Sequence, residues 1–376
     1  MINRQRLADE FISLVRIDSL TKQERKMADA LLRKLKDMGL EPYEDDTASK
    51  IGGDAGNVIC YVKGKKQKPA LMLMAHMDTV VPGISKKPVI DGDIIKTDGT
   101  TVLGGDDAAG IAVILETVKS LMEDKTPFAD IFLVFTVAEE SGLFGARNLD
   151  LSRIPADYAI ILDEGGDIGT VAVKAPHYNR FKVTFIGKAA HAGLEPEKGL
   201  NAIMMAAKAI AGMPHFGRID EESTSNIGII KGGQVRNIVC ETCEIEGEVR
   251  SVSEKKLNTY TDEILNHFKR VSEKMGGTVK IEVEKMYPGF NIKESDDIIS
   301  LLKEASEESE IPLKLIATGG GSDTNIFNGE GIPAINISVG MTNVHSTNEY
   351  IRISDMEKAC RFLTAVIKSA YNRNKS

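Results

Sequence analysis

The chain has 376 residues, of which 42% are hydrophobic and 27% are charged, and its formal net charge is −8. This length exceeds what one ordinary domain needs and is enough for two. Because no stretch is strongly basic, we expect neither nucleic acid nor an anionic membrane as a partner. The N-terminal segment carries charges throughout, unlike a signal peptide, and no apolar run is long enough to span a bilayer. We therefore expect a cytoplasmic protein.

Cysteine usage agrees with a reducing compartment. Four cysteines, Cys60, Cys240, Cys243 and Cys360, are too few for a disulfide scaffold. Cys240 and Cys243 have a CxxC spacing within an alternating segment that is typical of a strand. Because residues three apart on a strand point to opposite faces, we expect this pair to share neither a metal nor a disulfide.

The N-terminal part alternates helical and strand-like patterns. A helix is expected at residues 4–16, and a capping box of Thr21 and Glu24 predicts a second helix that stops at Gly39. The other elements expected here are strands at residues 57–62, 70–75, 131–138 and 158–162 and a helix at 115–125. Such alternation predicts an α/β fold with a mainly parallel sheet covered by helices.

The pattern changes near Pro176. From about residue 178 to residue 288 the order is strand, helix, strand, strand, helix, strand, which is typical of a ferredoxin-like sandwich. Beyond Ser295 the helix and strand alternation resumes, and it ends in a helix from about Ser354. The sequence thus predicts a catalytic domain formed by residues 1–176 and 289–376, with an inserted α+β domain at residues 177–288.

Carboxylates and imidazoles recur where the apolar runs end. They are His76 and Asp78 in LMLMAHMD, Asp106 and Asp107 in LGGDDAAG, Glu139 and Glu140 after IFLVFTVA, Asp163 in AIILDEGG, and His345 in TNVHSTNEY. Neighbouring carboxylates at the end of a buried strand are costly unless a positive charge lies against them. These groups suit a pair of divalent metals, with one carboxylate left over as a base. Hydrolysis by metal-activated water is therefore the leading interpretation.

Plainer explanations exist for the first of these residues. His76 and Asp78 share one face of a strand, but they could also belong to an ordinary surface turn. Asp106 and Asp107 could simply cap the helix that follows them. Capping by Asp107 and bridging of two cations by Asp106 are compatible with each other.

The later residues leave similar alternatives. Glu139 and Glu140 point in opposite directions if the strand continues through them, so one could reach a metal and the other a water. Either Asp163 or Glu164 could be a ligand, since both follow the same buried strand. A loop histidine such as His345 gains meaning only as the second imidazole of a ligand set.

Hydrolysis of an amide also needs groups that bind the substrate and its oxyanion. His191 in GKAAHAG is a candidate, and Arg250 and Asn237 could hold a carboxylate or a peptide oxygen, although both could be ordinary surface residues. The run GGGSDTN at residues 319–325 lacks the patterns of a P-loop or a dinucleotide site, which makes a phosphate-binding role a distant alternative. A glycine-rich turn before a helix can instead bind a peptide carboxylate.

Taken together, these segments resemble a known family. AHMDTV, GGDDAAG, TVAEESGLFGA, KAAHAGLEPEKGLNAI, GGGSDTNIF and NVHSTNEYI occur in the order found in peptidase T-like members of the co-catalytic zinc peptidase superfamily, and they span almost the whole chain. This superfamily also contains carboxypeptidase G, bacterial dipeptidases, a succinyl-diaminopimelate desuccinylase and aminoacylases. The resemblance implies a hydrolase with two divalent metal ions, for which zinc is the expected metal. It also implies a homodimer formed through the inserted lid domain.

The resemblance also implies a role for each site residue. The first zinc would be held by His76, Asp106 and Asp163, and the second by Asp106, Glu140 and His345. Asp78 would orient His76, and Glu139 would be the general base and later the acid.

For the substrate, His191 resembles a lid histidine that reaches the active site of a neighbouring subunit. Arg250, Asn237, Gly320 and Ser322 resemble substrate-binding positions.

Two positions bear on the activity that the resemblance implies. Ala108 stands where many relatives have lysine, but this is not a ligand position. Aspartate at position 163 is more similar to the aminopeptidases than to the carboxypeptidases and deacylases. We therefore expect an aminopeptidase that removes the N-terminal residue of short peptides such as tripeptides. The alternatives are a dipeptidase, carboxypeptidase or N-acyl amino acid deacylase of the same superfamily and, more distantly, a non-catalytic metal-dependent peptide-binding protein.

Overall fold

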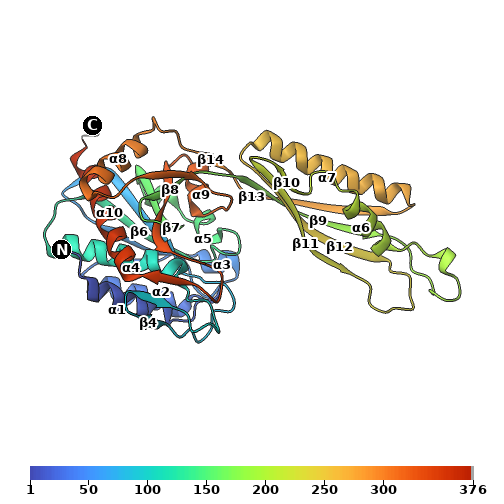
Figure 1. Cartoon of the computed structure of the whole chain (residues 1–376), viewed down its shortest axis with the longest axis horizontal. Helices are drawn as coiled ribbons and strands as arrows, with labels where there is room; N and C mark the ends of the chain where they lie inside the picture. The colour runs from blue at the N-terminus through green and yellow to red at the C-terminus, as the bar shows by residue number, and fades with distance from the viewer. Residues whose placement is uncertain (374–376) are drawn as a thin grey trace. The chain divides into compact units, whose positions relative to one another are not determined.

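The computed structural model describes residues 1–373, which divide into two compact units (Figure 1). The first unit contains Met1–Val173, Asn291–Thr318 and the chain from Ser322 onward, and the second contains Lys174–Phe290 with Gly319–Gly321. The second unit is therefore inserted into the chain of the first.

A mainly parallel sheet forms the centre of the first unit, as the alternating pattern predicts. Strand β3 is parallel to β6 and β7, and β7 is parallel to β16, whereas β2 joins β6 in antiparallel orientation. The sheet order is β1-β2-β6-β3-β7-β16-β8-β14, with β15 paired to β8. The strand bounds are β1 (Pro42–Glu44), β2 (Val58–Val62), β3 (Lys66–His76), β6 (Ala129–Thr136), β7 (Tyr158–Gly165), β8 (Thr170–Ala175), β14 (Phe290–Asn291), β15 (Lys314–Ala317) and β16 (Ala334–Met341).

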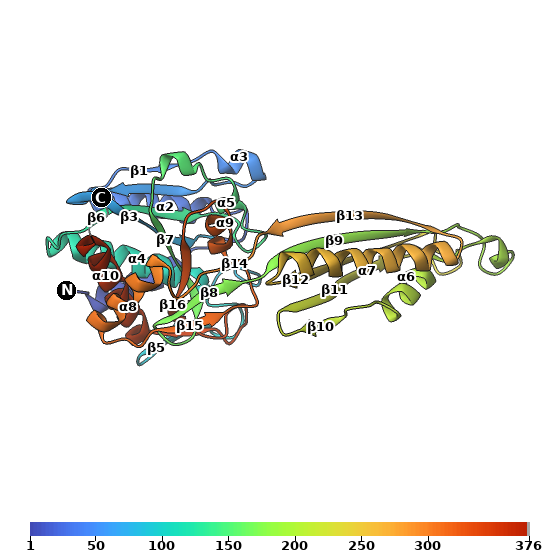
Figure 2. The same cartoon turned by 90° about the horizontal axis from the view of Figure 1, so that it is seen from above.

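Helices cover this sheet (Figure 2). Helix α4 packs against β3 and β7, α10 packs against β3 and β16, and α1 lies on α4. Every residue of β6 and of β16 is buried. Because successive strand residues face opposite sides of a sheet, both faces must be covered. The helix bounds are α1 (Arg4–Val15), α2 (Arg25–Asp37), α3 (Thr47–Ile51), α4 (Gly105–Glu123), α5 (Phe144–Arg147), α8 (Asp297–Ser309), α9 (Asp323–Gly329) and α10 (Ile353–Asn372).

A small second sheet lies in the same unit, in the order β17-β5-β4. Its strands are β4 (Val89–Asp91), β5 (Ile94–Lys96) and β17 (Tyr350–Arg352). Tyr350 pairs with Lys96 across it, so the chain just after His345 is tied to the segment that precedes Asp106.

The second unit is a ferredoxin-like sandwich with one more strand than the sequence predicts. Its antiparallel sheet has the order β10-β11-β12-β9-β13. The additional strand, β10, is a short edge strand. The bounds are β9 (His177–Ile186), α6 (Ala202–Ala211), β10 (Gly217–Asp220), β11 (Ser223–Gly232), β12 (Thr242–Ser251), α7 (Glu254–Lys274) and β13 (Thr278–Tyr287). Residues of α6, α7 and the sheet form a separate hydrophobic core.

Two local predictions are wrong. Helix α2 begins at Arg25 rather than at a capping box of Thr21 and Glu24, and the side chain of Glu24 caps no helix. Strand β12 begins at Thr242, so Cys240 lies outside it, and the thiols of Cys240 and Cys243 are buried in the same core instead of on opposite faces. All four cysteines are free and buried.

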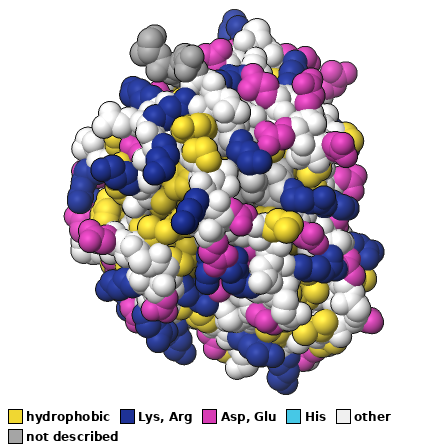
Figure 3. All heavy atoms as spheres, turned by 90° about the vertical axis from the view of Figure 1, so that its left-hand side faces the viewer, with side chains coloured by type: hydrophobic (Ala, Val, Ile, Leu, Met, Phe, Trp, Pro, Cys, Tyr) yellow, Lys and Arg dark blue, Asp and Glu magenta, His cyan; other side chains and the backbone are white. Residues whose placement is uncertain are grey.

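Two further features concern the helices and the surface charge of the described residues. None of the described helices is both long and apolar enough to cross a membrane. On the face drawn in Figure 3, basic and acidic side chains lie interspersed, so neither sign of charge dominates it.

Candidate active site

The site lies where the parallel strands of the first unit end. His76 is the last residue of β3 and pairs with Thr136, the last residue of β6. Asp163 lies near the end of β7, and Asp106 lies in the first turn of α4. Because parallel strands present their carboxyl ends at one edge, residues far apart in sequence meet there. Two groups of three could each hold a metal ion, His76 with Asp106 and Glu140, and His76 with Asp107 and Asp163, and the ligand atoms of each group lie within 4.8 Å of one another.

Asp106 faces a different imidazole with each of its two carboxylate oxygens. Its Oδ1 lies 2.9 Å from His76 Nε2, and its Oδ2 lies 3.1 Å from His345 Nε2. Asp163 Oδ1 is 3.7 Å from His76 Nε2, and Glu140 Oε1 is 2.8 Å from His345 Nε2. Two ligands of one ion, each about 2.1 Å from it, are about 3–3.5 Å apart. These distances match two neighbouring sites that share Asp106, with His345 as a further ligand, whereas the two groups of three share His76 and do not contain His345.

The charges of the site also fit cations. Among the described residues, only the imidazoles of His76 and His345 form ion pairs with these carboxylates, and no lysine or arginine does. Burial, with the charge of Asp106, raises the pKa of Asp163 well above its usual range. Hydrogen bonds with Asp106 and Glu140 raise the pKa of His345 to about 10. Such crowding of negative charge in a buried place is costly unless cations neutralise it, and nitrogen with carboxylate oxygen is a donor set for zinc.

Glu139 lies beside these groups but in neither ligand group. Only 7% of its surface is exposed. Burial raises the pKa of its carboxyl well above the usual range, and the neighbouring charges of Asp323 and Glu140 add to the effect. Asp323, whose Oδ2 accepts a hydrogen bond of 2.6 Å from Thr136 Oγ1, is a buried carboxylate that the sequence did not single out by itself. A buried carboxylate with a raised pKa is suited to accept and release a proton near neutral pH.

Asp78 contacts His76 in a way that differs from the expectation. His76 Nδ1 lies 2.9 Å from the backbone oxygen of Asp78 and 3.5 Å from its carboxylate. Donation to that carbonyl places a hydrogen on Nδ1 and leaves the lone pair of a neutral ring on Nε2, facing Asp106. The carboxylate of Asp78 instead accepts hydrogen bonds from the backbone N–H groups of Glu139 and Glu140, at 2.9 and 3.3 Å.

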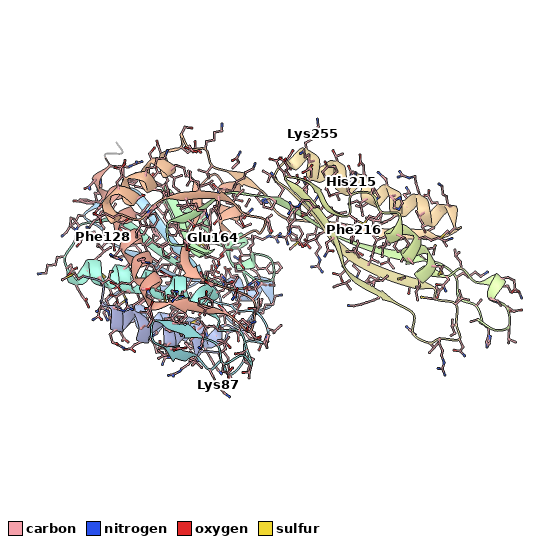
Figure 4. The ribbon with its side chains drawn as sticks, in the orientation of Figure 1. Lys87, Phe128, Glu164, His215, Phe216 and Lys255 are labelled. Carbon is pink, nitrogen blue, oxygen red and sulfur yellow. The ribbon has the colours of Figure 1, made fainter. Side chains whose placement is uncertain are left out.

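The sequence predicts helix capping by Asp107 and leaves open whether Asp163 or Glu164 is a ligand. Asp107 Oδ1 accepts a hydrogen bond of 3.0 Å from the Gly110 backbone, which is the contact of a helix cap. Its Oδ2 accepts one of 3.2 Å from the His76 backbone. Glu164, labelled in Figure 4, belongs to neither ligand group, whereas Asp163 does. The geometry therefore favours Asp163 over Glu164 as a ligand, and the role itself stays a prediction.

Strand β6 ends at Thr136, so Glu139 and Glu140 lie in a turn and not on a strand. Strand alternation would send their side chains in opposite directions only if the strand continued through them, and this condition is not met. Their directions are set by the turn, which begins with Ala138 in a left-handed conformation, at φ 52°.

Glu349 is a positioning residue that sequence reasoning missed. It is 1% exposed, and Oε2 accepts hydrogen bonds from the backbone of Leu103 and Gly104 at 2.7 and 2.9 Å. Its Oε1 accepts a third from the Asp106 backbone at 3.1 Å. Glu349 follows His345 by four residues, so it ties the loop of one candidate ligand to the loop of another. The only sequence signal is its place in STNEYI, which contains no spacing typical of this contact.

The predicted substrate-binding residues are divided between the units. In the second unit, His191 and Asn237 are exposed, and the two segments meet through a hydrogen bond of 2.9 Å from Ala192 N to Asn237 O. His191 Nδ1 accepts from the backbone of Gly193 and Leu194, both at 3.1 Å.

The guanidinium of Arg250 already contacts several groups of the protein. Its Nε and one terminal nitrogen donate to Glu248 at 3.1 and 3.2 Å, and the guanidinium lies over the Tyr178 ring, 4.5 Å from its centre. It also donates to Gly319 O at 3.3 Å, next to Gly320. Ser322 belongs to the first unit, where it is the N-cap of α9.

Comparison with known proteins agrees with this geometry. The family model described as peptidase family M20/M25/M40 matches residues 72–369. A Bacillus subtilis protein named uncharacterized protein YqjE is 44% identical over 98% of this chain and 100% of its own length. Two solved structures are similar over nearly their full lengths. The aminopeptidase PepT from Bacillus cereus has a TM-score of 0.89 and 42% identity, covering 98% of this chain and 99% of that one. A tripeptidase from Staphylococcus aureus has a TM-score of 0.93 and 37% identity, covering 99% and 100%.

The contacts of Glu349 generate the first prediction. Replacing Glu349 with Gln keeps its size but puts an amide nitrogen against backbone N–H groups, so the Asp106 loop loses part of its support. We expect the affinity for a divalent metal to fall by about 10–100-fold. Competition against a chromophoric chelator measures this. Glu357→Gln, at a partly exposed position of α10 where Glu357 pairs with Arg4, is the matched control. An unchanged affinity in Glu349→Gln would contradict the assignment.

Proposed function

Because the chain belongs to peptidase family M20/M25/M40, we propose that it is an aminopeptidase that releases the N-terminal residue of short peptides such as tripeptides. The observation that carries the proposal is Asp106, whose two oxygens each face one imidazole within a buried cluster of carboxylates. The similarity to an aminopeptidase at 42% identity and to a tripeptidase at 37% identity supports the substrate class.

The proposed metal content is two divalent ions, with zinc as the native metal. His76, Asp106 and Asp163 would hold one, and Asp106, Glu140 and His345 would hold the other. Bound there, the two ions would lower the pKa of a water molecule and stabilise the oxyanion of the substrate. Imidazole nitrogen with carboxylate oxygen suits zinc, and it also admits cobalt and manganese, so the donor set supports zinc without selecting it.

Glu139 would move the proton of the reaction. It would accept a proton from the attacking water as the oxygen bonds to the carbonyl carbon of the peptide. It would then give that proton to the amine nitrogen as the carbon–nitrogen bond breaks. Its burial and raised pKa support this double role, since a carboxyl that is protonated readily can also donate. The hydrogen bond from the Glu139 backbone N–H to Asp78 fixes the position of the Glu139 backbone.

Substrate contacts would come from the second unit and from the glycine-rich loop. His191 Nδ1 accepts two backbone hydrogen bonds, so in the neutral ring the hydrogen lies on Nε2. An exposed Nε2–H is a donor suited to a developing oxyanion, and we propose that His191 supplies it in the active site of a neighbouring subunit. Arg250, Asn237, Gly320 and Ser322 would contact the remainder of the peptide.

A homodimer through the second unit would bring such a neighbour. Strand β10 pairs only with residues 223–225 of β11, and no described strand pairs with the outer edge of residues 226–232. Exposed apolar side chains lie on this strand at Ile229 and Ile230, and exposed Ile203 lies against its last residue, Gly232. An apolar free edge favours pairing with the same edge of a second copy. The strand at the opposite edge, β13, carries lysines and glutamates, which disfavour pairing with another strand.

The compartment is proposed as the cytoplasm, where four free, buried thiols remain reduced.

The proton-transfer role of Glu139 can be tested by a single substitution. In Glu139→Gln we expect both metal ions to remain bound and kcat to fall by at least about 10²–10⁴-fold, because the amide cannot accept the proton. Metal content by mass spectrometry and turnover of a tripeptide measure the two effects. Glu164→Gln is the matched control, a neighbouring carboxylate outside both ligand groups. Wild-type turnover in Glu139→Gln would refute the assignment.

The substrate class can be tested with Ala-Ala-Ala and its N-acetylated form. We expect release of free alanine from the unblocked peptide alone, and loss of that activity after treatment with a chelator and its return with zinc. Cleavage of the acetylated form would favour a deacylase or carboxypeptidase. Bound metal without hydrolysis across a peptide panel would favour a peptide-binding protein.

Sedimentation measures the proposed dimer. We expect a species of twice the 40.9 kDa chain mass, and Ile230→Lys should shift it to the monomer because a lysine would enter an apolar edge. Val283→Lys, an exposed apolar position on β13, should leave the dimer intact. A monomeric wild-type protein would refute the dimer.

A further inference from the structure

In the turn that carries Glu139 and Glu140, the carbonyl groups of residues 137–139 accept hydrogen bonds from the backbone of residues 142–145, whereas the N–H groups of residues 137–140 are bound by side chains. Strand β6 ends at Thr136, and each of the next four backbone N–H groups donates to a side-chain oxygen. The four bonds are Val137 N to Asn57 Oδ1 at 3.1 Å, Ala138 N to Glu24 Oε1 at 2.9 Å, Glu139 N to Asp78 Oδ1 at 2.9 Å and Glu140 N to Asp78 Oδ2 at 3.3 Å. The position of the general base therefore depends on three side chains that come from elsewhere in the chain.

A short N-terminal segment supplies one of these side chains and supports another. Glu24 provides its own carboxylate, and Thr21 Oγ1 donates a hydrogen bond of 2.7 Å to Asp78 Oδ2. The segment is fastened in place, because Thr79 N donates to Ser19 O at 2.9 Å and Leu20 forms a bridge with Thr79. Neither Thr21 nor Glu24 belongs to a ligand group.

We propose that Thr21 and Glu24 are positioning residues of the peptidase reaction, which act by fixing the backbone that bears Glu139 and Glu140. This inference rests on the proposed role of Glu139. Thr21 acts through Asp78, whose Oδ2 it shares with Glu140 N. Glu24 acts directly on Ala138, the residue before the base.

The burial of Glu24 supports a functional reason for its presence. Glu24 is 0% exposed, its Oε1 accepts bonds from Lys22 N and Ala138 N, and its Oε2 has no hydrogen-bond partner among the described residues. A buried carboxylate with an unpaired oxygen lowers the stability of a fold. Ala138, which it holds, has a φ of 52°, a conformation that residues other than glycine adopt infrequently. Both features are expected where structure serves the chemistry of a site.

The contact geometry predicts which property of each side chain matters. For Thr21 it is the hydroxyl donor, since a methyl group in its place leaves Asp78 Oδ2 with one bond fewer. For Glu24 it is the acceptor oxygen Oε1. Glutamine keeps that oxygen, whereas methionine has a similar size and offers no comparable acceptor.

The experiment compares Thr21→Val with Thr21→Ser, and Glu24→Met with Glu24→Gln, in the metal-loaded full chain with Ala-Ala-Ala as substrate. Thr364→Val is a control for loss of a threonine hydroxyl, because Thr364 Oγ1 donates only to Cys360 O within α10. Backbone hydrogen exchange of a peptide covering residues 137–140 gives a readout that does not depend on activity. Metal content and thermal midpoint are measured for every variant.

For Thr21→Val and Glu24→Met we expect kcat to fall by about 10–100-fold and KM to change by less than about twofold, with the metals retained. Exchange at residues 137–140 should become about tenfold faster in both, because these amides lose their fixed partners. Thr21→Ser, Glu24→Gln and Thr364→Val should each stay within about threefold of the wild type.

Two results would overturn the proposal. One is wild-type kcat and exchange in Thr21→Val, which would show that Asp78 holds the turn without it. The other is a loss of activity that tracks the thermal midpoint and is not restored by Thr21→Ser, since this indicates general destabilisation. If the wild-type chain cleaved no peptide, the proposed function would fail, and the exchange rates would still decide whether Thr21 and Glu24 hold the turn.

Discussion

The structure depends on holding several negative charges together inside one unit without a lysine or arginine to neutralise them. Asp106, Asp107, Glu139, Glu140 and Asp163 are crowded at one sheet edge. The ion pairs described for them join Asp106, Glu140 and Asp163 to two imidazoles. Burial raises the pKa of Asp107, Glu139 and Asp163 well above the usual range, because it disfavours their charged forms. A site built in this way gains stability from cations and gives them little competition from fixed positive side chains.

Backbone N–H groups take the place that basic side chains would otherwise have. Asp78 and Glu349 together accept five of them, from residues 103, 104, 106, 139 and 140. This use of the backbone also explains a glycine. A Cβ at Gly105 would lie 2.9 Å from Glu349 Oε1, closer than such contacts allow, so any larger residue would push the carboxylate away from the Asp106 loop. The same contacts therefore pack the loops and place the candidate ligands.

The sequence predicts elements and ligands well because both leave local patterns. Period and burial mark β3, β6 and β7, and the acidic and imidazole residues directly after these strands are recognisable without a structure. The supporting contacts leave no such pattern. Thr21 and Glu24 have the spacing of a capping box, but they bond to Asp78 and Ala138, which are 57 and 114 residues away. A long-range hydrogen bond outcompetes a local preference here, and nothing in a short window of sequence records that competition. The prediction for the CxxC segment is wrong for a similar reason. The alternating sequence pattern extends to residues before Thr242, where strand pairing begins.

The place of the insertion separates the candidate metal ligands from the residues proposed to contact the substrate. The chain leaves the first unit after Val173 and returns at Asn291, between the candidate ligands Asp163 and His345. Asp163 and His345 lie on or beside β7 and β16, which pair directly in the parallel sheet, so their spacing is set within the first unit. The second unit has its own core and contains no residue of either ligand group. His191, Asn237 and Arg250, which we propose to contact the substrate, therefore lie in a part of the chain that holds none of the candidate metal ligands. Shared catalytic chemistry with differing substrate specificity is what this division of the chain permits.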